Sequence, residues 1–272
     1  GPLRRERLER IVTAHEQHAQ GLKSLLEPLG LASQQTAHET HLALRTRLPG
    51  DQGLTNYYVN VHRDWAWGDE ENAASLAHLQ SALPSGFQWG RTLVLGAGAA
   101  RLAYDIHMQC GPSLTVAADF NPLLLFVARD VTQGRTVSLH EFPIAPRRLE
   151  DEAVLRELCA PAPVREGFEL IAADGLHPPF AAGAFDTVVT PWFIDIIAEA
   201  LPRFAARVNR LLRDGGAWIN FGSLAFSQGT RALRFSFEET LEIVEQAGFT
   251  RPQPREASIP YMRSPATRHA RI

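Results

Sequence analysis

The sequence predicts an α/β protein built on a doubly wound parallel sheet, with an N-terminal helical extension. From residue 91 onward, short apolar runs alternate with helical segments, a pattern typical of parallel strands covered by helices on both faces. A glycine-rich turn, Gly96-Ala97-Gly98, follows the first apolar run, where such folds bind ligands. We expect residues 3–88 to form the extension, acting as a lid over the ligand, and residues 89–272 to form the core.

The composition is that of a soluble globular protein. In 272 residues, 45% are hydrophobic and 21% charged, which allows a core that needs no disulfides or metals. A net charge of -3 argues against binding to nucleic acid or an anionic membrane. Cys110 and Cys159 form no motif, and no apolar run is long enough to cross a bilayer. We therefore expect a cytoplasmic protein without a metal site.

The first part of the chain has helical periodicity. Apolar residues recur at spacings of three and four from residue 3 to about 48, and a second helix is predicted over 70–83. Four histidines at helical spacings, His15, His18, His38 and His41, lack the carboxylate or cysteine that would complete a zinc site. We expect them to be solvated or to cap helices.

The core elements follow from local patterns. The expected strands cover 92–95, 114–118, 168–173, 185–190, 217–221 and 257–262. The expected helices cover 102–108, 121–130, 195–212 and 237–247, the last closed by Gly248. Asn121 followed by Pro122 is typical of a helix N-cap and first turn. Residues 131–166 predict an irregular excursion with a short helix near 150–158.

The glycine turn and a later carboxylate together indicate nucleotide binding. Glycines at a strand-to-helix junction let the backbone approach a ligand, and the helix start offers free N–H groups. Asp119 ends the next strand, where a carboxylate can accept both hydroxyls of a ribose. Arg101 replaces the third glycine of the dinucleotide pattern. The alternatives are a tight turn at the glycines and a helix cap at Asp119.

A further segment resembles the class I methyltransferases. Between Ile171 and Val189 the chain contains, in this order, the motifs Asp-Gly, proline-phenylalanine, small-Gly-small and Phe-Asp-x-Val-Val. In that class, an acidic side chain after the third strand contacts the adenine amino group. Asp174 fits this role, and the alternative is a plain β-turn at Asp174-Gly175.

The downstream half resembles the carnosine N-methyltransferase family in particular. That family has V-V-T-x-F-F-I-D, then L-K-P-G-G-x-W-I-N-x-G-P-L, then L-S-x-E and a helix ending in G-F. The corresponding segments here start at Val188, Leu211 and Phe235 and end at Phe249. Upstream, the segment from Val94 to Ala103 resembles V-P-G-A-G-L-G-R-L-A, and the segment ending at Trp65 resembles V-R-D-W. The similarity covers residues 57 to about 250, except for a poor match over 131–166.

This resemblance implies an S-adenosylmethionine-dependent N-methyltransferase with a Rossmann-like sheet. It implies that the glycine turn holds the methionine part of the cofactor, Asp119 the ribose and Asp174 the adenine. Arg63 is expected at the carboxylate end, and Asn60 stands where the family has glutamine. The complete expected cofactor site is Asn60, Arg63, Gly96, Ala97, Gly98, Arg101, Asp119, Phe120, Asn121, Asp174, Gly175 and Thr190.

The resemblance also implies a small imidazole substrate, such as a histidine derivative. Trp192, Phe193 and Asp195 fall at the substrate, and Ser227 and Tyr261 complete the expected catalytic set. The alternatives are core packing for Trp192 and a helix N-cap for Asp195. Where the family has tyrosine-histidine, this chain has Phe226-Ser227, and Ala198 replaces another family histidine.

These departures leave the acceptor open. A different small amine or azole is one alternative to an imidazole compound. A protein that binds the cofactor without catalysis is another, and a nicotinamide-dependent oxidoreductase is a third.

Overall fold

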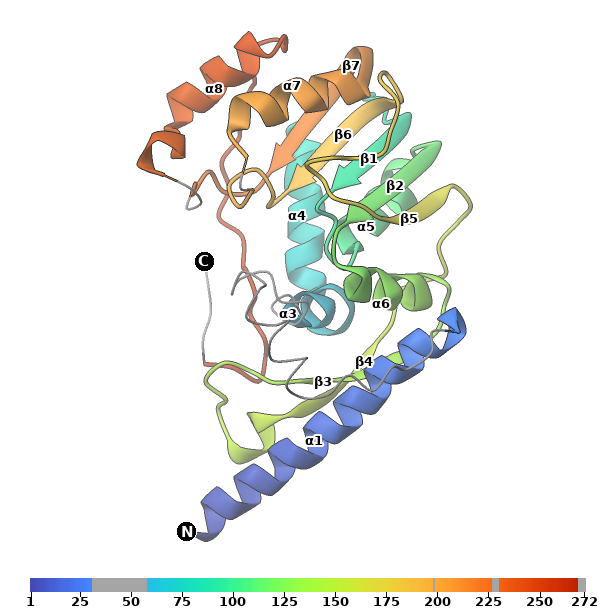
Figure 1. Ribbon diagram of the computed structural model, residues 1–272, viewed down its shortest axis with the longest axis vertical. Coiled ribbons are helices and arrows are strands. Elements are labelled where there is room, and N and C mark those ends of the chain that lie inside the picture. Colours follow the sequence, from blue (N-terminus) through green and yellow to red (C-terminus); the bar gives the residue numbers. More distant parts are fainter. Residues whose placement is uncertain (31–57, 198, 227–229, 269–272) are drawn as a thin grey trace. The chain divides into compact units, whose positions relative to one another are not determined.

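The structure is a computed structural model that describes residues 1–30, 58–197, 199–226 and 230–268 (Figure 1). The chain forms two compact units, each made from separate stretches of sequence. The first unit contains residues 1–70, 126–163 and 260–272, and the second contains residues 71–125 and 164–259. The division into a lid and a core at residue 88 remains a prediction. Within the described ranges, no helix combines the length and apolar character needed to cross a membrane.

The second unit contains a five-stranded parallel sheet. Its strands are β1 (Arg91–Leu95), β2 (Leu114–Asp119), β5 (Phe168–Ala172), β6 (Phe185–Pro191) and β7 (Leu212–Phe221). They lie in the order β5-β2-β1-β6-β7, and every neighbouring pair is parallel. The strand order runs outward in both directions from β1 and β6, so the topological switch point lies between these two strands. The predicted doubly wound fold is confirmed.

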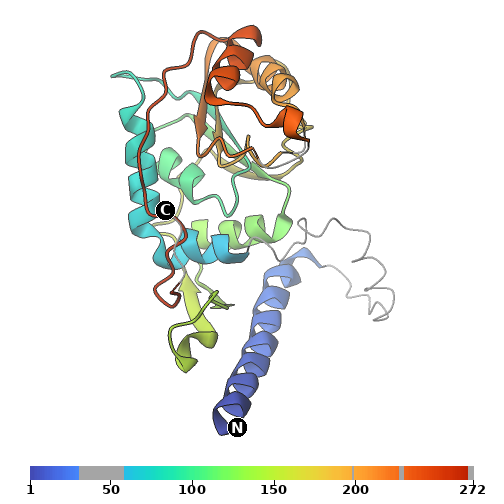
Figure 2. The same ribbon diagram turned by 90° about the vertical axis from the view of Figure 1, so that its left-hand side faces the viewer.

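Helices cover both faces of this sheet. They are α4 (Asp69–Ser81), α5 (Arg101–Cys110), α7 (Leu201–Leu211) and α8 (Phe237–Gln246). The 3-10 turn η4 (Arg231–Leu233) also belongs to this unit, and α6 (Pro122–Thr132) begins in it and continues in the first unit. Figure 2 shows α4 and α5 on one face of the sheet and α7 and α8 together on the other. Leu93, Val188 and Phe204 are fully buried between the strands and α7.

Local signals set the helix boundaries. Asn121 Oδ1 accepts the backbone N–H of Leu123 at 3.1 Å, which confirms the predicted cap of α6. Ser236 and Glu239 form a reciprocal capping box at the start of α8. Gly248 follows the end of α8 with φ +94°, a conformation that glycine adopts readily.

Two predicted boundaries in this part of the chain are wrong. The helix expected over 195–212 begins only at Leu201, because Pro202 favours the first turn of a helix and disfavours a longer one before it. The strand expected over 257–262 is absent. Pro260 lies within that run and has no N–H to donate to a neighbouring strand.

The first unit combines helices with a small antiparallel sheet. Its elements are α1 (Pro2–Leu26), η1 (Glu27–Leu29), α3 (Tyr58–His62), η2 (Arg63–Trp67), β3 (Val137–Glu141), η3 (Leu149–Glu152) and β4 (Val154–Leu158). The helix expected near 150–158 is wrong except for η3, since β4 pairs with β3. Arg156 binds Glu141 across the pair at 2.8 Å. This cross-strand pairing overrides the helix propensity of the Leu-Arg-Glu-Leu segment.

Helix α1 packs closely on β3. A Cβ atom added to Gly21 would lie 2.9 Å from the carbonyl oxygen of Ser138, so only glycine allows this approach. The ring of His15 stacks on Phe142 at 4.1 Å, and His18 is buried with its ring edge-on to Phe142. The expectation that His18 is solvated is therefore wrong. His38 and His41 lie outside the described residues.

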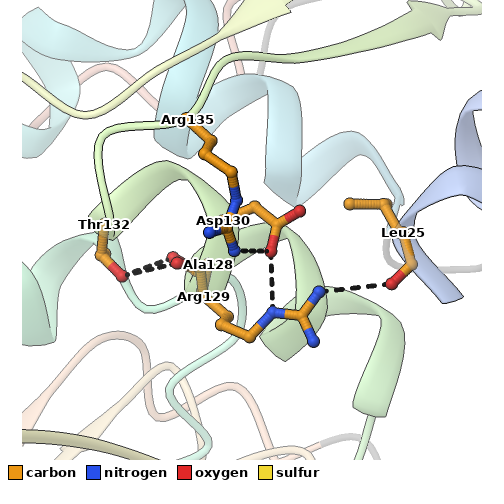
Figure 3. A network of polar contacts seen from close by, with 6 residues as sticks. All are labelled: Leu25, Ala128, Arg129, Asp130, Thr132 and Arg135. Atoms are coloured by element: carbon orange, nitrogen blue, oxygen red, sulfur yellow. Dashed lines mark hydrogen bonds and ion pairs between the residues drawn. The ribbon is translucent and has the colours of Figure 1, made fainter. Parts of the chain in front are cut away.

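A polar network joins the end of α1 to α6 (Figure 3). Arg129 donates to the carbonyl oxygen of Leu25 at 3.3 Å and to Asp130 at 2.7 Å. Arg135 donates to the same Asp130 oxygen at 2.6 Å. The Asp130 carboxylate thus holds two guanidinium groups, one of which caps the final turn of α1.

The first unit should lose stability in mild acid because of His62. Burial, followed by the charges of His18 and Arg156, lowers the pKa of His62 to about 3, and a hydrogen bond with the His140 backbone only partly opposes this. Below about pH 6.5 the unfolded chain binds a proton that the folded chain excludes, so the free energy of unfolding falls as the pH falls. From pH 6.5 to 5, His62 alone should remove about 2 kcal/mol.

Urea unfolding between pH 7.5 and 5 measures this slope, which His62→Gln should flatten. His78→Gln, in the second unit, controls for the loss of a histidine. Equal flattening in both variants would contradict the assignment to His62.

Candidate functional site

The loops that follow all five parallel strands meet at one edge of the sheet. The first, after β1, is fixed by two backbone hydrogen bonds: the N–H groups of Gly96 and Ala97 donate to the carbonyl oxygen of Ala118 at 2.9 and 3.1 Å. Gly96 has φ +69° and Gly98 φ +59°, so both use the left-handed region. The predicted glycine turn is therefore anchored to the end of β2.

Asp119 joins this turn to the start of α6. Its Oδ2 accepts the N–H of Gly98 at 2.8 Å, and its Oδ1 accepts the N–H of Asn121 at 2.8 Å. Burial raises the pKa of the Asp119 carboxyl above its ordinary value, and these N–H bonds only partly oppose it. A third backbone N–H, that of Phe120, also bonds to this carboxylate, so about one of its roughly four acceptor positions remains for a ligand. The next residue, Phe120, is 50% exposed and presents an aromatic ring at the same edge.

Arg101 begins α5 directly behind the turn. Its Nε lies 3.1 and 3.0 Å from the two oxygens of Asp105, one helical turn further on, and both side chains are buried. The position that a third glycine would occupy in the dinucleotide pattern therefore carries a buried ion pair. Ala100 caps the helix with φ +67°, an uncommon conformation for a residue with a side chain.

Asp174 lies in a turn after β5. Its Oδ1 accepts the N–H of Leu176 at 2.8 Å, and its Oδ2 lies 2.8 Å from Nδ1 of His177. Although desolvation raises the pKa of Asp174, the hydrogen bonds from His177 and Leu176 bring it below its ordinary value. The N–H of His177 also bonds to the carbonyl oxygen of Asp174 at 2.9 Å, which makes the segment a β-turn. The side chain remains 57% exposed and open to a ligand.

Phe193 packs against two of these loops. A Cβ atom added to Gly96 would lie 2.3 Å from Cδ2 of Phe193, and one added to Gly175 would lie 2.7 Å from its Cζ. The ring of Phe193 is also 5.5 Å from that of Phe204 in α7. Phe193, in the loop after β6, thus contacts the loops after β1 and β5. A side chain at Gly96 or Gly175 would overlap its ring.

Two motif segments meet at Thr190. The Thr190 hydroxyl donates to Oδ1 of Asn220 at 2.9 Å and accepts from Nε1 of Trp218 at 3.0 Å. All three side chains belong to the adjacent strands β6 and β7. These bonds join the V-V-T and W-I-N segments of this chain, and they occupy the Thr190 hydroxyl with contacts inside the sheet.

Asp195 is the buried carboxylate of this edge. It is only 6% exposed and lies in a turn, while α7 is capped by Ala200, so the helix-cap alternative is wrong. Its Oδ2 accepts a hydrogen bond from the hydroxyl of Ser223. Within the described residues its Oδ1 is buried and has no hydrogen-bond partner. A buried carboxylate oxygen without a donor is costly, and a ligand N–H would satisfy it.

Trp192 holds the same loop. It has φ +50°, and its N–H donates to the carbonyl oxygen of Phe221 at 2.6 Å. Its indole is half-buried, with its ring 5.6 Å from that of Phe221. The loops after β6 and β7 are therefore joined by both backbone and ring contacts.

Four further predicted residues lie in the first unit or outside the described ranges. Asn60, Arg63 and Tyr261 belong to the first unit, where Arg63 donates to Oδ1 of Asp64 from Nε at 2.7 Å. Ser227 lies outside the described residues. The sequence prediction missed Ser223 and His177. Ser223 could have been noticed because it replaces the proline of the family's G-P-L.

Gly96→Ala should destabilise the second unit more than Gly111→Ala. Both glycines have φ +69°, which costs a residue with a side chain about 1 kcal/mol. A Cβ at Gly111 meets nothing within 4 Å, whereas one at Gly96 overlaps Phe193 and adds about 1–3 kcal/mol. Urea unfolding measures the difference, and Phe193→Leu should restore part of it in a double-mutant cycle. Equal costs at the two glycines would refute the proposed packing of Phe193.

Comparison with known proteins places the chain in a family. The family profile described as carnosine N-methyltransferase matches residues 54–266, well over half of the chain. Carnosine N-methyltransferase unmet of Drosophila melanogaster is 26% identical over 179 residues, which cover 58% of this chain and 38% of that protein. Carnosine N-methyltransferase of Mus musculus is 25% identical over 187 residues, which cover 61% of this chain and 45% of that protein. The alignments thus span less than half the length of these curated relatives.

Among solved structures, a Haemonchus contortus phosphoethanolamine N-methyltransferase 2 in complex with S-adenosyl-L-methionine is similar. It has a TM-score of 0.47 and 18% identity, covering 73% of this chain and 43% of that chain. At this level of similarity, the fold assignment rests on the strand order described above. The profile match over residues 54–266, together with the joined V-V-T and W-I-N segments, shows that the chain belongs to the carnosine N-methyltransferase family.

Proposed function

We propose that this chain transfers a methyl group from S-adenosylmethionine to a ring nitrogen of a small imidazole compound, such as a histidine derivative. The observation that carries the proposal is the buried Asp195 carboxylate, whose Oδ1 has no partner among the described residues. It follows β6, next to the switch point where doubly wound folds bind their ligands. Family membership supports methyl transfer as the reaction.

The residues present fit the methyl donor. The backbone of the Gly96-Ala97-Gly98 turn would hold its methionine part, and the remaining acceptor position of Asp119 would accept a ribose hydroxyl. The exposed Asp174 carboxylate would accept the adenine amino group. When bound, S-adenosylmethionine supplies a methyl group activated by a positively charged sulfur. Roles for Asn60, Arg63 and Tyr261 rest on the family resemblance alone.

Asp195 would act on the acceptor ring. An imidazole with a pKa near 6.5 is largely neutral at pH 7, so one nitrogen has a free lone pair and needs no strong base. Asp195 Oδ1 would accept the N–H of the other nitrogen, which fixes the tautomer and aims the lone pair. As the ring becomes cationic on methylation, the nearby carboxylate stabilises it. Holding the two reactants in line supplies most of the remaining acceleration.

We also propose that the substrate is a free small molecule and that the protein works in the cytoplasm. A net charge of -3 offers little attraction for nucleic acid or anionic membranes. Cys110 and Cys159 are free thiols, which fits a reducing compartment.

Asp119→Asn should weaken S-adenosylmethionine binding by about 10- to 100-fold, because a hydrogen bond to a charged group contributes about 1.5–3 kcal/mol. Isothermal titration with S-adenosylmethionine and S-adenosylhomocysteine measures this, with NAD as a negative control. Asp214→Asn, at an exposed position near the start of β7, should bind like the wild type. Binding of NAD but not of S-adenosylmethionine would support an oxidoreductase instead.

Asp195→Asn should lower kcat for imidazole acceptors by about 100-fold or more while leaving cofactor affinity unchanged, because the lost charge acts only on the ring. Mass spectrometry of histidine derivatives incubated with enzyme and S-adenosylmethionine detects the added methyl group. Undiminished turnover in this variant would disprove the role of Asp195. Cofactor binding without methylation of any imidazole would direct the search to other amines.

A further inference from the structure

A single side chain fixes the orientation of Asp195. The Ser223 hydroxyl donates to Oδ2 of Asp195, and the opposite oxygen, Oδ1, has no partner in the described part of the chain. A carboxylate bound at one oxygen cannot rotate freely without losing that bond. The hydrogen bond from Ser223 therefore determines which oxygen is left for a ligand.

The backbone brings these two residues together through two unusual conformations. Gly222 has φ +140°, and a Cβ there would lie 3.0 Å from Cα of Trp192. Trp192 itself has φ +50° and is bonded to Phe221. The close contact of Gly222 with Trp192 places Ser223 within reach of Asp195, three residues beyond Trp192. Such strained positions persist only where surrounding contacts hold them.

The hydroxyl at position 223 departs from the pattern that the resemblance implies. That pattern, G-P-L, has proline where this chain has Ser223, and a proline side chain has no hydroxyl to donate. Close by in sequence, Phe226 takes the place of the family's tyrosine, and its ring packs against that of Phe235 at 5.6 Å. A hydroxyl is thus lost at position 226 and gained at position 223.

We propose that Ser223 is a positioning residue that makes the site selective for azoles carrying an N–H opposite the nitrogen to be methylated. This inference rests on the proposed function of Asp195 and names the class of acceptor. With Oδ2 held by Ser223, Oδ1 is offered to one N–H donor. An azole without that N–H would leave a buried carboxylate oxygen unpaired. Sites built around a buried hydrogen-bonding group strongly reject ligands that lack the matching partner.

The test compares imidazole with 1-methylimidazole and thiazole, which lack the N–H. Thiazole is close to imidazole in size. Comparing it with 1-methylimidazole therefore distinguishes the effect of the missing N–H from the steric effect of the added methyl group. Dissociation constants are measured by titration in the presence of saturating S-adenosylhomocysteine, and kcat/KM with S-adenosylmethionine. The wild type should prefer imidazole over thiazole by about 10-fold or more in both measurements.

Ser223→Ala should reduce this preference by about 3- to 10-fold, and Ser223→Thr, which keeps a hydroxyl, should retain it. Ser113→Ala, on an exposed loop, is the matched control. A merely structural role for Ser223 would weaken all three azoles equally and leave the ratio unchanged, which would overturn the proposal. If Ser223→Ala folds poorly, the Ser223→Thr variant decides the question. A loss of the preference for imidazole over thiazole in Ser223→Thr would also contradict the proposal.

The binding measurement separates this inference from the proposed function. Selective imidazole binding that depends on Ser223, but without methyl transfer, would uphold the positioning role and refute the proposed reaction. Methyl transfer with equal preference for imidazole and thiazole would uphold the reaction and refute the role of Ser223. Failure of the wild type to bind any of the three azoles would refute both.

Discussion

The candidate site depends on Asp119, which connects three segments that the sequence separates. Its carboxylate binds the N–H of Gly98 after β1 and of Asn121 before α6, each at 2.8 Å. Its carbonyl oxygen accepts the N–H of Ala173 after β5 at 2.9 Å. Because β1, β2 and β5 are adjacent and parallel, their carboxyl ends already meet at one edge. The hydrogen bonds of Asp119 convert this proximity into a fixed arrangement of backbone groups.

A second connection holds the other half of the edge. Thr190, Trp218 and Asn220 join β6 to β7 through side chains, and the Trp192 N–H joins the loop after β6 to Phe221. Phe193 then packs this loop against Gly96 and Gly175. The motif residues that identify the family are therefore largely structural. They leave Asp195, with its unpartnered Oδ1 among the described residues, as the group for which we propose a substrate contact.

The sequence predicted the parts of this arrangement that local patterns determine. The strands around Leu93 and Val188, the glycine turn and the Asn121 cap are each encoded by neighbouring residues, and the structure confirms them. Segment 154–158 was mistaken for a helix because its strand conformation depends on pairing with β3, far away in sequence. The Asp195–Ser223 contact escaped prediction for the same reason. It joins two loops whose approach depends on the conformations of Trp192 and Gly222.

The chemistry of the partner chosen for Asp195 matters as much as its position. An arginine or lysine at Ser223 would neutralise the carboxylate, and the field at the acceptor ring would largely disappear. A hydroxyl satisfies one oxygen and adds no positive charge beside it. A ring that gains positive charge on methylation is then stabilised more strongly than the neutral ring that enters, which is the difference that accelerates a reaction. Methylation at nitrogen creates such a charge, whereas an oxygen acceptor that loses its proton on methylation ends without one. On the proposed role of Asp195, the buried carboxylate held by the Ser223 hydroxyl favours a nitrogen acceptor on electrostatic grounds.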